Sequence, residues 1–247
     1  MPSINATIDT PDGACPVTLH TPNGTGPWSG VVMFPDAGGV RPTFQEMAAR
    51  LAGFGHAVLL PDVYYRDGDW EPFDMGTVFT DEAARKRLFG MISSLTPERV
   101  AGDAGAFFDF LAARPEVRGD RFGVCGYCMG GRISVTLAGL LPDRIAAAGS
   151  FHGGGLVVDG DDASPHLLAD RMTATIYVAG AENDKSFTTE HAETLEKALT
   201  AAGVTHTVEI YPAGHGFAVP DNVPYDEEAA ERHWIALQEL FETALPS

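Results

Sequence analysis

Short apolar runs alternate with helical patterns from Gly30 to Leu245. A short apolar run bounded by turn residues is typical of a buried strand, and strands that alternate with helices indicate a mostly parallel, doubly wound sheet. The expected strands are 30–35, 56–61, 121–126, 145–151, 173–179 and 205–211. The expected helices are 43–53, 81–94, 98–113, 129–140, 190–202 and 227–245. The pattern predicts an α/β fold that binds ligands at the carboxyl ends of its strands.

Two extended segments, 5–10 and 15–21, precede this alternation and are separated by Pro11-Asp12-Gly13. A turn sequence between two short strands indicates a hairpin, so we expect N-terminal antiparallel edge strands. Residues 64–80 carry aromatic, Asp and Gly residues without periodicity and are expected to form a loop that lines the site. A chain of 247 residues fits one α/β domain over 1–247.

The composition is strongly acidic, with 34 acidic and 16 basic side chains and a net charge of -18. This charge repels nucleic acid and anionic lipid, and an anionic substrate would need a local Arg or Lys. The first residues lack the basic segment followed by an apolar segment that is typical of a secretory signal. No apolar run has membrane-spanning length. The cysteines lack the spacing of a zinc site: Cys15, Cys125 and Cys128. We expect a cytoplasmic protein without metal or membrane partner.

The strand expected to end at Gly126 leads into Gly-Tyr-Cys-Met-Gly-Gly, which ends at Gly131. This is the G-x-nucleophile-x-G spacing of hydrolases, with Cys128 in the usual place of Ser. A nucleophile on such a sharp turn needs small residues two positions before and after it, and the helix from Met129 favours a thiolate. The alternative for Cys128 is a buried structural cysteine in a glycine-rich turn, and Cys125, inside the strand, is expected to be structural. No G-x-S-x-G sequence is present, and Ser150 is expected in a core strand.

Hydrolases of this kind carry the acid and then the histidine in loops after later strands. His215, between two glycines, has the required place in the chain, whereas other histidines are expected at the surface: His166, His191, His206 and His233. Glu182 and Asp184 both lie in the loop expected to hold the acid. Asp184 is favoured because its shorter side chain suits a fixed partner at a turn.

Two backbone N–H groups are expected to stabilise an oxyanion. One belongs to Met129, directly after the nucleophile, and the other to Ala37, in the glycine-containing loop after the first parallel strand. A plain glycine turn is the alternative for Ala37.

The elbow around Cys128, together with Pro61-Asp-Val-Tyr64, Asp184 and Ala213-Gly-His-Gly-Phe217, resembles the dienelactone hydrolase, or carboxymethylenebutenolidase, family. The resemblance spans nearly the whole chain. It implies an α/β-hydrolase fold and cleavage of a cyclic enol-lactone without cofactor or metal. It also implies that Cys128, Asp184 and His215 form the triad.

The resemblance implies further residues around the thiol. Asp36 stands where family members keep a Glu that activates the thiol, although it is also a plausible turn residue. Arg85 falls on one of two family arginines that bind a substrate carboxylate; the other is expected just after His215, where the run to Pro220 contains no arginine. The further candidates for substrate binding or thiol activation are Tyr64, Tyr127 and His152.

The sequence therefore predicts a cysteine-dependent hydrolase of small carboxylic esters or lactones, acting through a thioacyl-enzyme. A ligand-binding pseudoenzyme and a thiol redox sensor are the alternatives on the same fold. We expect a monomer or a small homo-oligomer.

Overall fold

The computed structural model describes residues 1–74, 76–78 and 80–245. Its eight strands form one sheet in the order β1-β2-β4-β3-β5-β6-β7-β8. The sheet begins with an antiparallel hairpin, β1 (Ser3–Thr10) and β2 (Gly13–His20), and β2 pairs antiparallel with β4 (His56–Pro61). From β4 onward all neighbours are parallel. The predicted fold class is thus confirmed: an α/β fold, mostly parallel, with antiparallel strands at the N-terminal edge.

The parallel strands are β3 (Trp28–Phe34), β5 (Val117–Tyr127), β6 (Ile145–Phe151), β7 (Thr175–Ala181) and β8 (His206–Tyr211). Of these only β6 has the expected bounds at both ends, and β5 and β7 differ from them the most. β5 starts at Val117 and not at 121, because its first residues pair with β3 across an irregularity in register. β7 continues to Ala181 because Gly180 and Ala181 still pair with Ile210 and Tyr211 of β8, although a Gly-Ala pair suggests a turn.

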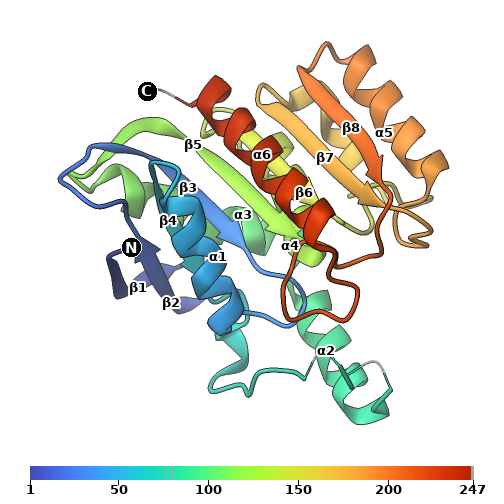
Figure 1. Cartoon of the computed structure of the whole chain (residues 1–247), viewed down its shortest axis with the longest axis horizontal. Helices are drawn as coiled ribbons and strands as arrows, with labels where there is room; N and C mark the ends of the chain where they lie inside the picture. The colour runs from blue at the N-terminus through green and yellow to red at the C-terminus, as the bar shows by residue number, and fades with distance from the viewer. Residues whose placement is uncertain (75, 79, 246–247) are drawn as a thin grey trace.

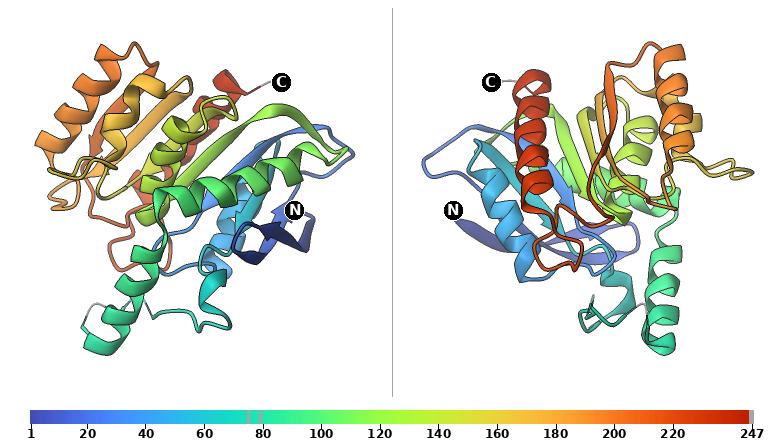
Figure 2. Two further views of the ribbon diagram at one scale, coloured as in Figure 1. Left: turned by 180° about the vertical axis from the view of Figure 1, so that it is seen from behind. Right: turned by 45° about the vertical axis from the view of Figure 1, so that its right-hand side comes forward.

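Helices cover both faces of the sheet (Figures 1 and 2). One face carries α1 (Pro42–Ala52) and α6 (Glu227–Ala244). The other carries α3 (Pro97–Ala112), α4 (Met129–Leu140) and α5 (Thr189–Ala201). Successive strand residues point to opposite faces, so Val31 joins the core under α1 and α6, while Val32 joins the core under α3 and α4. Burial on both faces explains why the strands are apolar throughout.

α2 (Glu82–Ser94) projects away from the sheet in both figures. It begins at Asp81, whose carboxylate accepts a hydrogen bond from the Ala84 N–H. Two short 3₁₀ segments, η1 (Tyr65–Asp67) and η2 (Pro165–Arg171), were not expected. No helix in the described residues is long and apolar enough to span a membrane.

Candidate active site

The catalytic candidates lie in loops at the same edge of the sheet. Cys128 directly follows β5, Asp184 follows β7 and His215 follows β8, and parallel strands present their carboxyl ends together. Ala37 follows β3 at this edge. A cavity of about 240 Å³ opens here, and its lining residues are Asp36, Ala37, Cys128, His215, Gly216, Asn222, Val223 and Pro224.

Cys128 occupies a strained turn between β5 and α4. Its φ of 53° lies in the left-handed region, which non-glycine residues rarely adopt. A Cβ atom at Gly126 would lie 2.1 Å from the Gly130 carbonyl oxygen, and one at Gly130 would lie 2.4 Å from the Phe34 carbonyl oxygen. The two glycines therefore permit the crossing of strand and helix that exposes the thiol.

A hydrogen bond joins His215 to Asp184. His215 Nδ1 lies 2.6 Å from Asp184 Oδ2, and the other carboxylate oxygen accepts from the N–H and hydroxyl of Ser186 at 2.8 and 2.6 Å. Burial alone would raise the pKa of Asp184, but the hydrogen bonds from His215 and Ser186 outweigh it and lower that pKa. Glu182, the other candidate acid, is exposed.

The environment of His215 favours the imidazolium. Burial alone would lower its pKa, but the hydrogen bond with Asp184 and the neighbouring Cys128 thiol raise that pKa to about 10. The Cys128 thiol is partly exposed, whereas Cys15 and Cys125 are buried, and burial raises the pKa of both. Of the three thiols, only Cys128 combines access to solvent with a basic neighbour.

Ala37 lies in a tight turn. The Gly39 N–H donates to the Asp36 carbonyl at 2.9 Å, and the Gly38 N–H donates to Asp36 Oδ1 at 2.9 Å. Among the described residues, no protein acceptor takes the N–H of Ala37 or of Met129. Two unpartnered N–H groups therefore flank Cys128, as an oxyanion hole requires.

The Asp36 carboxylate is bound to other groups than the thiol. Arg41 donates to both of its oxygens at 2.7 and 3.0 Å, and Asn222 donates to Oδ2 at 3.2 Å. Arg41 also pairs with Asp221, at 2.7 Å for each of two contacts, and is only 9% exposed. Thiol activation by Asp36 therefore has no support in its contacts, which tie the Ala37 turn to the loop after His215. Sequence reasoning missed Arg41, whose partners lie at opposite ends of the chain.

Three further candidates are buried away from the cavity. Tyr127 points into the core, where its hydroxyl lies 3.2 Å from His233 Nε2, so it binds no substrate. His152 packs behind His215, with ring centroids 5.3 Å apart, and neither of its ring nitrogens has a partner in the described structure. Tyr64 donates to the Ala37 carbonyl at 3.0 Å. His233, expected at the surface, is fully buried, so that expectation was wrong.

Burial sets the protonation of His152. Desolvation lowers its pKa far below the usual value, so the imidazole is neutral, and its φ of 40° marks a second strained backbone beside the site. A neutral ring in this place supports the His215 ring by contact only.

Arg85 does not reach the cavity. It is exposed on the projecting helix α2, and the cavity lining includes no residue of the 64–80 loop. The expected carboxylate contact and the expected site-lining role of this loop are therefore not seen in the described residues. Met75 and Phe79 of that loop lie outside them. No group of three or more His, Cys, Asp or Glu side chains in the described chain is arranged to hold a metal ion.

The sheet order, with a sharp glycine-flanked turn between β5 and α4, is that of the α/β-hydrolase fold. The chain belongs to the dienelactone hydrolase family, whose model matches residues 15–245. The protein is accordingly a carboxylic ester hydrolase.

Known proteins match over nearly their whole length. A Synechocystis protein with the provisional name carboxymethylenebutenolidase is 29% identical over 230 residues, which cover 92% of this chain and 91% of that protein. The carboxymethylenebutenolidase of Rhodococcus opacus is 28% identical over 233 residues, covering 92% and 86%. A crystal structure from Klebsiella pneumoniae, provisionally named dienelactone hydrolase, superposes with a TM-score of 0.82 at 26% identity and covers 98% of both chains.

Proposed function

We propose that the protein hydrolyses small, uncharged carboxylic esters or lactones by a Cys128–His215–Asp184 triad, through a thioacyl-enzyme. The observation that carries the proposal is the 2.6 Å hydrogen bond from His215 to Asp184, beside a strained and accessible Cys128. A buried carboxylate on one ring nitrogen leaves the other free to exchange a proton with the thiol.

The reaction takes place in two steps. The Cys128 thiolate forms a bond to the acyl carbon, and the carbonyl electrons move to the oxygen, which the N–H groups of Ala37 and Met129 stabilise. The ester C–O bond then breaks, and the alkoxide takes the proton of His215. Water next gives a proton to His215 and attacks the thioester, and the carboxylic acid leaves as the thiolate is restored.

The cavity lining supports the uncharged substrate class. Its lining residues include no Arg or Lys, and Asp36 is its one carboxylate. Arg41 lies behind Asp36 and is neutralised by two carboxylates, so it offers no free positive charge. The -18 net charge adds a repulsive field, and the 240 Å³ volume limits the acyl group to a small one.

A matched pair of substrates tests both parts of the proposal. p-Nitrophenyl butyrate and the p-nitrophenyl monoester of succinic acid have acyl groups of equal chain length and differ in one carboxylate. We expect kcat/KM for the butyrate to be at least about tenfold higher than for the succinate, because the carboxylate of the succinate meets no positive partner in the cavity. A preference for the succinate would contradict the neutral class.

The Cys128→Ala variant is the second test of the proposed function. It removes the nucleophile in a turn that tolerates a smaller side chain, so turnover is expected to fall to background while circular dichroism is unchanged. Turnover within tenfold of the unmodified protein would reject Cys128 as nucleophile. No turnover by the unmodified protein would favour a ligand-binding role on the same fold.

The thiolate nucleophile suits a reducing cytoplasm, which we propose as the location.

A further inference from the structure

The hydroxyl of Tyr64 lies between the two segments that carry the proposed oxyanion donors. It donates to the Ala37 carbonyl at 3.0 Å and lies 3.2 Å from the Met129 sulfur. Tyr64 is fully buried, and burial raises the pKa of its hydroxyl, so the proton stays available for donation. A fully buried hydroxyl with these two contacts links the β3 loop to the first residue of α4.

The turn at Ala37 depends on this contact. The N–H groups of Gly38 and Gly39 are both bound to Asp36, but these bonds leave the Ala37 carbonyl without a partner inside the turn. Tyr64 supplies that partner. With the carbonyl and the following N–H both bound, the Ala37–Gly38 peptide plane is fixed. The Ala37 N–H lies in the preceding plane, whose Asp36 carbonyl accepts from the Gly39 N–H, so both planes of the turn are held.

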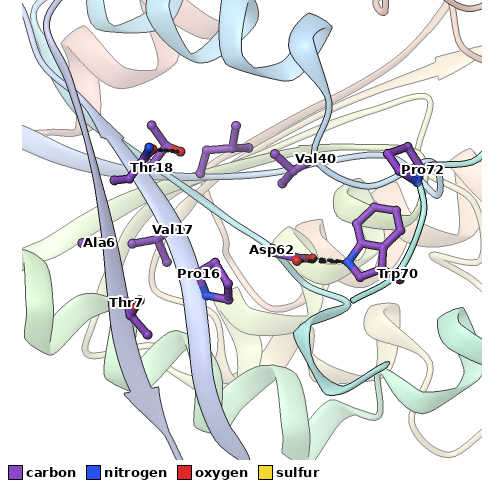
Figure 3. Close-up of a pocket in the computed structure, with 11 residues that line it drawn as sticks. Ala6, Thr7, Pro16, Val17, Thr18, Val40, Asp62, Trp70 and Pro72 are labelled. Carbon is purple, nitrogen blue, oxygen red and sulfur yellow. Dashed lines mark hydrogen bonds between the residues drawn. The ribbon is translucent and has the colours of Figure 1, made fainter. Parts of the chain in front are cut away.

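Tyr64 is itself held from behind. Its backbone N–H donates to Asp62 Oδ1 at 3.0 Å. The Trp70 indole N–H donates to the same carboxylate at 3.1 and 3.0 Å, as Figure 3 shows. The Tyr64 and Trp70 rings meet edge to face, with centroids 5.3 Å apart. A Cβ atom at Gly39 would lie 2.4 Å from the Trp70 ring, so the indole packs directly under the turn.

We propose that Tyr64 is a positioning residue for the oxyanion hole. Its hydroxyl holds the Ala37 turn against the first turn of α4, so that the N–H groups of Ala37 and Met129 converge on the oxygen of the tetrahedral intermediate. Tyr64 touches no substrate and acts only through Ala37 and Met129. This inference rests on the proposed thioacyl mechanism and adds the cause of its preorganisation.

Tyr64→Phe is the variant to make, because Phe keeps the ring packing against Trp70 and removes only the hydroxyl. Direct removal of an oxyanion donor lowers kcat by about 10²- to 10³-fold, and loss of a group that aligns one is expected to lower kcat by about tenfold. KM for p-nitrophenyl butyrate should change by less than about twofold, since the donors act on the transition state.

Two reactions of the same thiol separate positioning from general damage. Acylation by p-nitrophenyl butyrate passes through an oxyanion, whereas alkylation by iodoacetamide displaces iodide and forms none. In Tyr64→Phe we expect acylation to slow by about tenfold while alkylation of Cys128 keeps its rate. Unchanged acylation, or an equal loss in both reactions, would overturn the inference. Cys128→Ala gives the background alkylation of the other cysteines.

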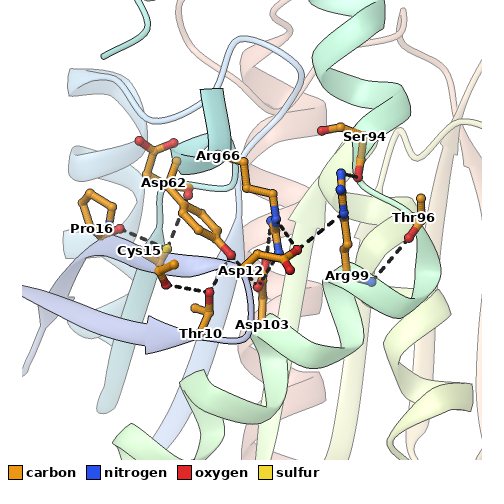
Figure 4. A network of polar contacts seen from close by, with 12 residues as sticks. Thr10, Asp12, Cys15, Pro16, Asp62, Arg66, Ser94, Thr96, Arg99 and Asp103 are labelled. Atoms are coloured by element: carbon orange, nitrogen blue, oxygen red, sulfur yellow. Dashed lines mark hydrogen bonds and ion pairs between the residues drawn. The ribbon is translucent and has the colours of Figure 1, made fainter. Parts of the chain in front are cut away.

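Tyr65→Phe is a matched control in the next residue. The Tyr65 hydroxyl lies 2.6 Å from the Thr10 hydroxyl and 2.9 Å from Asp103, in a polar network on the far side of this segment (Figure 4 labels Thr10 and Asp103). In the described structure its hydroxyl bonds to Thr10 and Asp103 and not to the Ala37 turn, so both reactions should keep their rates. A tenfold loss of acylation in Tyr65→Phe as well would overturn the specific role of Tyr64. A failure of the thioacyl mechanism itself would be recognised separately, because the Cys128→Ala variant would then remain active.

Discussion

The acid of the site is distinguished from its neighbour by contacts of single atoms. Asp184 accepts from His215 and Ser186, whereas Glu182 in the same loop is exposed. Asp184→Asn replaces an acceptor by an amide and destabilises the imidazolium, so kcat is expected to fall by about 10³- to 10⁴-fold. Glu182→Gln should change kcat by less than about twofold, because no contact of the triad is altered. Steady-state rates with p-nitrophenyl butyrate measure both, and the reverse order would move the acid to Glu182.

The charge state of His215 predicts the pH dependence. Its pKa is raised from 6.5 to about 10, so the imidazolium that protonates the leaving alkoxide persists through neutral pH and is lost above about pH 10. The alkaline limb of kcat/KM is therefore expected near pH 10. Because the hydrogen bond to Asp184 is the largest single cause that raises this pKa, the limb should move toward neutral pH in the residual activity of Asp184→Asn. An alkaline limb near pH 7 in the unmodified protein would contradict the ion-pair description.

Side-chain direction explains which residues were placed wrongly from the sequence. Side chains two residues apart on a strand point to the same face. Because Cys125 is expected in the core, the same reasoning places Tyr127 in the core as well, on the same face of the sheet. His233 follows Ala229 and Ala230 at helical spacing on the buried face of α6, a signal that was available. The Asp36–Arg41–Asp221 contacts had no signal, because Arg41 and Asp221 are distant in sequence and meet only in the folded chain.

At the scale of elements, the crossing of β5 and α4 sets a steric limit. A Cβ atom at Gly130 would lie 2.4 and 2.5 Å from the carbonyl oxygens of Phe34 and Pro35, and backbone cannot move aside easily. Gly130→Ala is therefore expected to lower the free energy of unfolding by about 3 kcal/mol, or to prevent folding. Urea denaturation measures this.

Gly105→Ala is the control for that substitution. Gly105 lies in α3 with nothing within 4 Å of an added Cβ, and Ala is the better helix former. This variant should gain about 0.5–1 kcal/mol in the free energy of unfolding. Equal losses in the two variants would mean that steric contact at the elbow is not the cause.

The elements and the catalytic loops were predictable because their causes are local. Apolar runs and helix periodicity located the elements. At the elbow, Gly126 is required by its clash with Gly130, four residues later, and the fixed spacing shows Gly130 in the sequence although its own clash is with distant backbone. The order of acid and histidine along parallel strands located the loops at 184 and 215. The path of residues 64–80 was not predictable, since Tyr64 and Trp70 are placed by packing against the distant Gly39.

At the scale of the whole molecule, the -18 charge acts on substrate approach. Added salt shortens the Debye length from about 30 Å at about 0.01 M to about 8 Å at 0.15 M, so kcat/KM for an anionic ester should rise with salt while that for a neutral ester stays constant. Arg85→Ala should leave both values within about twofold, because Arg85 is exposed on α2. A selective loss for the anionic ester in Arg85→Ala would instead show that α2 closes over the substrate.

An exposed turn at Gly160 divides the chain between the first and the second pair of site residues. Ala37 and Cys128 precede Gly160, which is exposed with nothing within 4 Å of an added Cβ, while Asp184 and His215 follow it. Opening the chain after Gly160 yields two fragments, neither with a complete triad, which can restore it by pairing β6 with β7 and by packing η2 and α6 against α4 and β6. We expect each fragment to be inactive and the mixture to regain esterase activity at a rate that depends on concentration. The enzyme could then serve as a fragment-complementation reporter, in which turnover of a chromogenic ester records the reunion of two halves of one sheet.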